Sequence, residues 1–165
     1  MEQTVLEPGV LVIEDEEKIR KYLARALRDE GMTVDEAGDG EAGIAAFERA
    51  PRPVVLLDLR MPRLDGMAVL ERIHATRPET QVIILSAHGD MPAAVRALNL
   101  HAAAWLTKPP DLDRVIAEVK NAWSRFVDER GLPIEAAPTE GQPPGIDEVW
   151  KAMSGVSLSR ERGGG

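Results

Sequence analysis

The sequence predicts an α/β domain in which five helices cover the two faces of a doubly wound, five-stranded parallel sheet. Two observations carry this prediction. Five short apolar runs alternate with five segments whose apolar residues recur every three or four positions, as on one face of a helix. Three of the runs (VLVIE, VVLLD and QVIILS) are almost continuously apolar, which is typical of strands buried on both faces of a parallel sheet.

The expected strands follow from these apolar runs. They are Val10–Glu14, Thr33–Ala37, Val54–Asp58, Gln81–Ser86 and Ala103–Thr107. Strands that alternate with helices form right-handed βαβ units, so we expect all five strands to be parallel.

The first helix is predicted by apolar residues at the spacing i, i+3, i+4, i+7, i+8, namely Ile19, Tyr22, Leu23, Ala26 and Leu27. Weaker helical patterns cover about 41–49, 66–75 and 92–100. A longer helix is marked by Leu112, Val115, Ile116, Val119, Trp123 and Phe126. Asp90 and Asp111 precede the last two helices and are predicted to cap them, because a carboxylate can accept hydrogen bonds from the first free N–H groups of a helix.

The chain is expected to divide into an N-terminal extension (1–8), the folded domain (9–130) and a tail (131–165). Gly131–Gly145 contains four prolines and three glycines, which is typical of a flexible linker. Ile146, Val149, Trp150 and Met153 then have helical spacing, so a short helix over 146–153 is a hypothesis. It would dock onto a partner or onto the chain's own domain; the alternative is an unstructured tail with a chance periodicity.

Composition excludes several classes of protein. The net charge of −8 gives no basic surplus for binding nucleic acid, so direct nucleic-acid binding by this chain is not expected. Without cysteine there is no disulfide or thiolate metal site. No apolar stretch approaches the roughly 20 residues that span a bilayer, and the N-terminus lacks a signal-peptide pattern. We therefore expect a cytoplasmic protein without membrane contact.

Polar side chains stand where the apolar strands end. Glu14 and Asp15 end the first strand, Asp58 the third and Ser86 the fourth, while Lys108 follows the fifth. Each alone is more often structural than functional. Because the carboxyl ends of parallel strands meet at one edge of the sheet, we expect these side chains to converge on one crevice.

The chemistry of this set is complementary. Three neighbouring carboxylates repel each other unless a hard cation such as Mg²⁺, which prefers oxygen ligands, lies between them. Asp58 could then attack phosphorus as a nucleophile, while Lys108 and Ser86 contact the phosphoryl oxygens.

Four segments, VLVIEDEEKIR, VVLLDLRMPRLDGMAVL, VIILSAHGD and AAWLTKP, resemble the receiver domain of two-component response regulators, over about residues 9–127. The resemblance implies a flavodoxin-like receiver fold. It also implies a Mg²⁺ site made by Glu14, Asp15, Asp58 and the backbone carbonyl of Arg60, with Glu14 acting through water. Asp58 would take its phosphoryl group from a histidine kinase or phosphotransfer protein. The Lys108–Pro109 bond is expected to be cis.

In this family the phosphoryl group acts on a hydroxyl residue and an aromatic residue, which match Ser86 and Trp105 here. Their movement would reshape the surface formed by 92–100, 103–107 and 111–127, and this surface would bind a protein partner or form a phosphorylation-dependent homodimer. Arg60 and His88 occupy positions that tune hydrolysis in relatives; both are long, so slow autodephosphorylation is predicted.

Three positions depart from the family pattern. His101 stands after the fourth helix where glycine is usual, and a left-handed C-cap favours glycine. Pro110 replaces the phenylalanine that usually follows Lys-Pro, and tryptophan at position 105 is less common than tyrosine or phenylalanine. All three lie on the predicted output surface.

Several functions fit this pattern. They are a stand-alone receiver, a receiver fragment of a transcriptional regulator, and an inert receiver-like interaction module. An aspartate-nucleophile phosphatase shares the chemistry, but such enzymes commonly carry a second aspartate where Arg60 stands. We therefore expect a signalling phosphoacceptor that catalyses only its own phosphorylation and dephosphorylation, and not an enzyme acting on other substrates.

Overall fold

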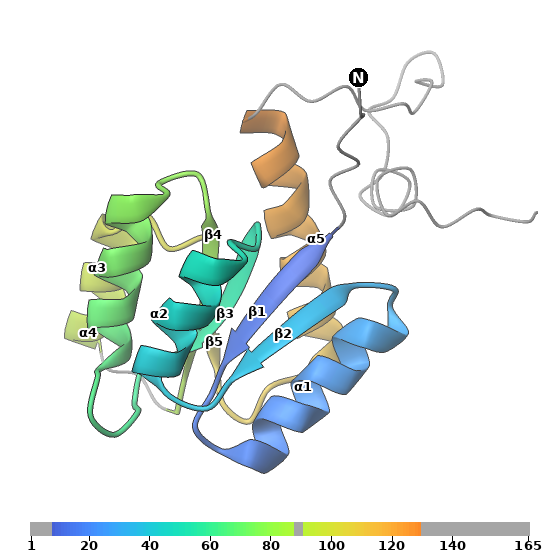
Figure 1. The fold of residues 1–165 in the computed structure, drawn as a ribbon, viewed down its shortest axis with the longest axis horizontal. Helices are drawn as coiled ribbons and strands as arrows, with labels where there is room; N and C mark the ends of the chain where they lie inside the picture. The colour runs from blue at the N-terminus through green and yellow to red at the C-terminus, as the bar shows by residue number, and fades with distance from the viewer. Residues whose placement is uncertain (1–7, 88–90, 130–165) are drawn as a thin grey trace, which may run out of the picture.

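The computed structural model describes residues 8–87 and 91–129 as five strands that alternate with five helices (Figure 1). In chain order these elements are β1 (Gly9–Ile13), α1 (Glu17–Asp29), β2 (Thr33–Ala37), α2 (Gly40–Arg49), β3 (Val54–Asp58), α3 (Gly66–Thr76), β4 (Gln81–Ser86), α4 (Met91–Asn99), β5 (Ala104–Thr107) and α5 (Leu112–Glu129). The predicted α/β class is confirmed.

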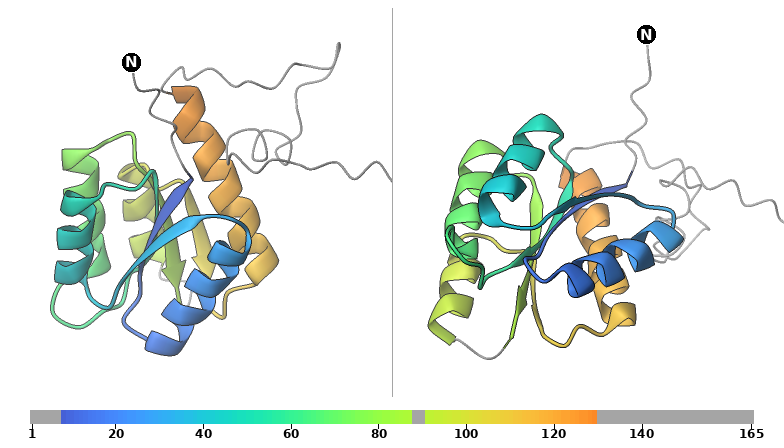
Figure 2. Two further views of the ribbon diagram at one scale, coloured as in Figure 1. Left: turned by 45° about the vertical axis from the view of Figure 1, so that its right-hand side comes forward. Right: turned by 60° about the horizontal axis from the view of Figure 1, so that its bottom comes forward.

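All strand pairs are parallel, and the strand order is β2-β1-β3-β4-β5. Helices α1 and α5 cover one face of the sheet, and α2, α3 and α4 cover the other (Figures 1 and 2). The chain leaves β1 toward β2 on one side and continues through β3 on the other. This reversal opens a crevice at the carboxyl ends of β1 and β3, where α/β proteins bind ligands.

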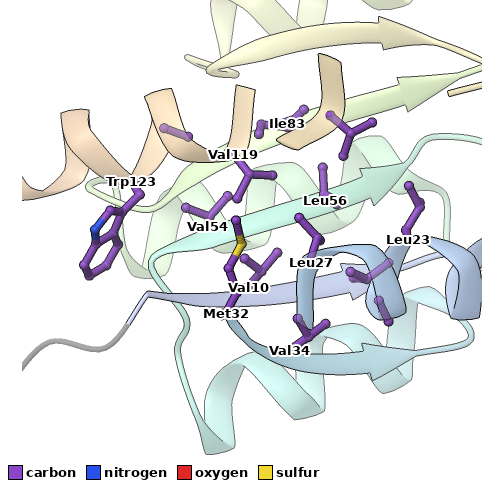
Figure 3. Packing of buried hydrophobic residues seen from close by; sticks show 14 of the residues in the cluster. Val10, Leu23, Leu27, Met32, Val34, Val54, Leu56, Ile83, Val119 and Trp123 are labelled. Carbon is purple, nitrogen blue, oxygen red and sulfur yellow. The ribbon is translucent and has the colours of Figure 1, made fainter. Parts of the chain in front are cut away.

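The core consists of two apolar layers, one on each face of the sheet. Successive strand residues point to opposite faces. Val10 and Val12 therefore join the layer under α1 and α5, while Leu11 and Ile13 join the layer under α2 and α3. Figure 3 shows the first layer, which contains Leu56 and Trp123. The nearly continuous apolar runs are explained by burial on both faces, and they hold the strand ends in place.

Three of the predicted strands have the predicted bounds, and two differ. β1 lies one residue earlier than expected, because Gly9 pairs with Thr33 and the ladder ends at Ile13 opposite Ala37. Glu14 was thus wrongly included in the strand, although its N–H still donates to the Ala37 carbonyl (3.1 Å). β5 starts at Ala104, one residue later than predicted.

The predicted cap at Asp111 is confirmed, since its Oδ1 accepts a hydrogen bond from the N–H of Asp113 (3.0 Å). The structure adds two caps that the sequence analysis did not select. Asp39 accepts from Ala42 and Asp65 from Met67, each at 2.7 Å. Asp90 and the predicted helix over 146–153 lie outside the described residues, as do 131–165 as a whole. No helix in the described part of the chain is long and apolar enough to cross a membrane.

Candidate functional site

The carboxyl ends of the strands bring the predicted acidic residues together. Glu14 and Asp15 follow β1, and Asp58 is the last residue of β3. One carboxylate oxygen from each of the three lies within 4.8 Å of the others. Glu14 is fully buried and Asp58 is 3% exposed, whereas Asp15 is exposed at the mouth of the cluster. The structure thus brings these three carboxylates together at one crevice, as predicted.

Lys108 extends over this cluster from the end of β5. Its Nζ donates a hydrogen bond to Glu14 Oε1 (3.0 Å) and lies 2.8 Å from Glu14 Oε2 and 3.2 Å from Asp58 Oδ2. The N–H of Lys108 donates to the Ser86 carbonyl (2.7 Å), and the Lys108–Pro109 peptide is cis, as the resemblance implied. The ammonium group therefore contacts two of the three carboxylates at once.

Two backbone N–H groups fix how the buried carboxylates are oriented. The N–H of Glu16 donates to Glu14 Oε1 (3.2 Å), and that of Arg60 donates to Asp58 Oδ1 (3.1 Å). Both donors lie two residues after the carboxylate they contact. Each turn at a strand end thus holds one oxygen of its own acidic side chain, while the other oxygen contacts Lys108.

The acidic cluster carries excess negative charge, and two of its three carboxylates, Glu14 and Asp58, are buried. Burial raises the pKa of Glu14 from its ordinary 4.5 to about 7; Lys108 opposes this rise and the charge of Asp58 adds to it. Burial likewise raises the pKa of Asp58, against the lowering effect of Lys108. For Lys108, burial alone would lower the pKa, but its contacts with Glu14 and Asp58 outweigh burial and raise it. One ammonium group does not neutralise three carboxylates.

The donor set of the cluster fits a hard divalent cation. Three carboxylates with oxygens within 4.8 Å of one another match the oxygen ligands that Mg²⁺ prefers. Glu14 Oε2 is buried and has no hydrogen-bond donor, since its 2.8 Å contact with Lys108 is an ion pair outside hydrogen-bond geometry. A cation at the mouth, beside exposed Asp15, would offset the remaining charge.

Residues 10–120 match the family model of the response regulator receiver domain. The chain belongs to this family. It is 34% identical over 155 residues to the DNA-binding transcriptional regulator NtrC of Salmonella typhimurium, a match that covers 91% of this chain and 33% of NtrC. It is 36% identical over 152 residues to the transcriptional regulatory protein TcrA of Mycobacterium tuberculosis, covering 92% of this chain and 60% of TcrA. The chain therefore spans only part of the length of these relatives.

Solved receiver structures show the same fold. The response regulator receiver domain from Clostridium thermocellum is 33% identical to this chain and has a TM-score of 0.68, over 71% of this chain and 94% of that domain. The acidic cluster of this receiver thus lies in a fold shared with a known receiver domain.

Ser86, at the end of β4, is 1% exposed and lies beside a cleft of about 590 Å³. The cleft lies between the loop after β3, α3 and α4. It is lined by Leu59, Arg60, Met61, Asp65, Met67, Ser86, Ala93 and Arg96. Sequence reasoning selected Arg60 and Ser86 but missed Arg96, because its presence here depends on how α4 packs and no local pattern signals that.

The remaining predicted residues lie around the receiver's β4 and β5. Trp105 is half-buried, pairs in register with Ile84, and packs against the apolar layer under α2 and α3. His101 has a φ of 61°, the left-handed conformation expected where relatives have glycine, and its ring centroid lies 5.3 Å from that of His74. His88 lies outside the described residues.

Replacing Asp15 with asparagine is expected to have opposite effects with and without Mg²⁺. Without the ion, loss of one of three mutually repelling charges should raise the free energy of unfolding by about 1 kcal/mol. With the ion, the unmodified receiver is expected to show a Mg²⁺-dependent rise in Tm, and the variant should show little of it, because a ligand is lost. Thermal unfolding in EDTA and in excess Mg²⁺ measures both effects.

The control for this variant is Glu16→Gln, which changes an exposed carboxylate next to the cluster but outside it. It should leave both Tm values within a degree or so of the unmodified protein. Equal behaviour of Asp15→Asn and Glu16→Gln in both conditions would contradict the assignment of Asp15 to the cation site.

Proposed function

We propose that this receiver accepts a phosphoryl group on Asp58 from a histidine kinase or phosphotransfer protein. The observation that carries the proposal is the position of Asp58 between a backbone N–H, the ammonium group of Lys108 and two further carboxylates. In the reaction, a carboxylate oxygen of Asp58 forms a bond to phosphorus while the bond from phosphorus to the donor's imidazole nitrogen breaks. The product is an aspartyl phosphate.

The surrounding residues supply position and charge. Glu14, Asp15, Asp58 and the backbone carbonyl of Arg60 would hold Mg²⁺, with Glu14 acting through water, and the ion would neutralise the incoming phosphoryl oxygens. Lys108 would pair with a phosphoryl oxygen in place of part of its present contact with Asp58. Ser86, buried at the end of the next strand, would donate its hydroxyl hydrogen to another.

The signal would leave through Trp105. Ser86 and Trp105 lie on paired strands, where Ser86 is opposite Thr107 and Trp105 is opposite Ile84. Movement of Ser86 toward the phosphoryl group would allow the half-buried indole of Trp105 to turn further inward. The surface of α4, β5 and α5 would then change shape and bind a protein partner or a second phosphorylated copy.

Hydrolysis of the aspartyl phosphate is expected to be slow. Arg60 is exposed and lines the cleft beside the site, where its long side chain would restrict water. His88 is proposed to act in the same way. Measuring the loss of the phosphoryl group over time checks this, and loss within seconds would refute it.

The experiment that tests phosphoryl acceptance is intact mass measurement after incubation with acetyl phosphate and Mg²⁺. The unmodified protein should gain the mass of one phosphoryl group, and Asp58→Asn should gain none. Asp65→Asn is the matched control, since Asp65 caps α3 in the same loop but is outside the acidic cluster; it should still be phosphorylated. If the unmodified protein gained no mass, an inert receiver-like module would be the better description.

A second candidate is that this receiver serves a transcriptional regulator. The matches to NtrC and TcrA cover 91% and 92% of this chain, so they continue beyond α5 and the receiver domain itself. This candidate shares the chemistry at Asp58 and differs only in output. Fusing the chain to the remainder of a TcrA-like regulator and measuring phosphorylation-dependent transcription would separate it from a stand-alone receiver that signals by docking.

A further inference from the structure

Arg20 forms a bridge between α1 and the carboxyl ends of two strands. Its Nη1 donates a hydrogen bond to the backbone carbonyl of Glu14 (2.9 Å), and its Nε lies 3.6 Å from Glu36 Oε1 on β2. The guanidinium group also passes close to Gly38, where a Cβ would lie 3.1 Å from Nη1. Only 16% of the Arg20 side chain is exposed. The guanidinium group is therefore held in a fixed place beside the turn that carries Glu14 and Asp15.

The turn after β1 is held by backbone hydrogen bonds and by the guanidinium group of Arg20. The N–H of Glu14 donates to Ala37, and the N–H of Arg20 donates to Glu16. Arg20 binds the backbone carbonyl of Glu14, while Lys108 contacts the Glu14 side chain. Holding this carbonyl determines the direction in which Glu14 and Asp15 leave the chain.

We propose that Arg20 is a positioning residue that sets the geometry of Glu14 and Asp15 for binding Mg²⁺. The inference rests on the proposed function, because it assumes that the acidic cluster takes up the ion. Groups that orient metal ligands through hydrogen bonds affect affinity strongly, and their loss typically weakens metal binding about 10- to 100-fold.

The sign of the effect distinguishes positioning from simple electrostatics. Arg20 is a cation near a cation site, so removing its charge would, by Coulomb's law alone, strengthen Mg²⁺ binding. Removing its hold on the turn would weaken binding, because Glu14 and Asp15 would lose their common orientation. The proposal predicts the second result.

The test uses Arg20→Met, which keeps most of the aliphatic stem and removes the charge and donors, with Arg28→Met as the matched control. Arg28 is on the same helix and also pairs with Glu36 (3.2 Å), but its other contact is the Val34 carbonyl within β2. Arg28→Met thus removes the same charge and an ion pair to the same carboxylate, away from the acidic turn. Mg²⁺ affinity is measured by titration calorimetry and stability by urea unfolding in EDTA.

We expect the Kd for Mg²⁺ to rise about tenfold in Arg20→Met and to change less than about twofold in Arg28→Met. Arg20→Lys, which keeps the charge and one donor to the carbonyl, should fall between Arg20→Met and the unmodified protein. Unchanged or tighter Mg²⁺ binding by Arg20→Met would overturn the inference, as would an equal loss in Arg28→Met. If the unmodified protein itself bound no Mg²⁺, the proposed function would fail first, so the two failures are distinguishable.

Discussion

Alanine at position 66 is expected to lower the free energy of unfolding by about 3 kcal/mol, near the upper end of the effect of an overpacked site. Gly66 starts α3 and its N–H donates to the Leu59 carbonyl (3.0 Å), which presses the helix start against the end of β3. A Cβ on Gly66 would overlap the carbonyl oxygen of Asp58 and lie 2.5 Å from the Leu59 Cα. Both are backbone atoms, one in the last residue of the central strand β3 and one in the residue after it, so neither can move aside without disturbing the sheet.

The same substitution should weaken Mg²⁺ binding, because any displacement of β3 moves Asp58. Gly9→Ala is the control: the three atoms nearest to a Cβ there all belong to the Arg52 side chain, the closest being Cδ at 2.8 Å, and a flexible side chain can shift. Urea unfolding of both variants, with and without Mg²⁺, measures the two effects. If Gly66→Ala were as stable as Gly9→Ala, the start of α3 could move away from the end of β3 at little cost, which would contradict this prediction.

The sheet could be predicted from the sequence because its signal is local. β3 and β4 are buried on both faces, so their apolar runs are nearly continuous and their ends are marked by Asp58 and Ser86. The ends of β1 could not be predicted to the residue, since pairing with β2 decides where the ladder stops.

The site could be predicted as a set of residues but not as a set of contacts. Parallel strands ending together predict that Glu14, Asp58 and Lys108 meet. Lys108 contacts both oxygens of Glu14 more closely than it contacts Asp58. This difference depends on where β1, β3 and β5 end relative to one another, which the sequence does not specify. Arg20 has no sequence pattern at all, because its partners, Glu14 just after β1 and Glu36 on β2, come together only through the fold.

Replacing Lys108 with methionine is expected to have the second large effect. Methionine fills similar volume without charge, and it leaves fully buried Glu14 and nearly buried Asp58 without their cation. Removing one partner of a buried ion pair typically costs about 3 kcal/mol or more, because the remaining charge is uncompensated. We expect a loss of this size in the free energy of unfolding in EDTA at about pH 8, well above the ordinary pKa of both carboxylates.

Lys120→Met is the matched control. The Lys120 side chain has the same exposed fraction as that of Lys108, 15%, but its Nζ pairs with Glu30, which is 39% exposed, at 3.3 Å. A pair with a partner this exposed is expected to contribute less than about 1 kcal/mol. Equal losses in the two variants would contradict the view that Lys108 is the main counter-charge of the acidic cluster.

The loss in Lys108→Met should also depend on pH in a defined direction. The pKa of Glu14 in the folded receiver is about 7, above its ordinary 4.5, and removing Lys108 takes away a contact that lowers it. The folded variant therefore binds more protons than the unfolded chain above about pH 4.5, so its free energy of unfolding falls as pH rises through that window. Near pH 5 Glu14 can remain protonated, and most of the difference from the unmodified protein should disappear. Excess Mg²⁺ at about pH 8 should restore part of the stability by supplying the missing positive charge. Neither change should alter the smaller loss that Lys120→Met shows relative to the unmodified protein, because that variant keeps the acidic cluster intact. If the loss in the free energy of unfolding of Lys108→Met stayed constant from pH 5 to pH 8 and did not change with Mg²⁺, Lys108 would stabilise the fold by packing and not by charge.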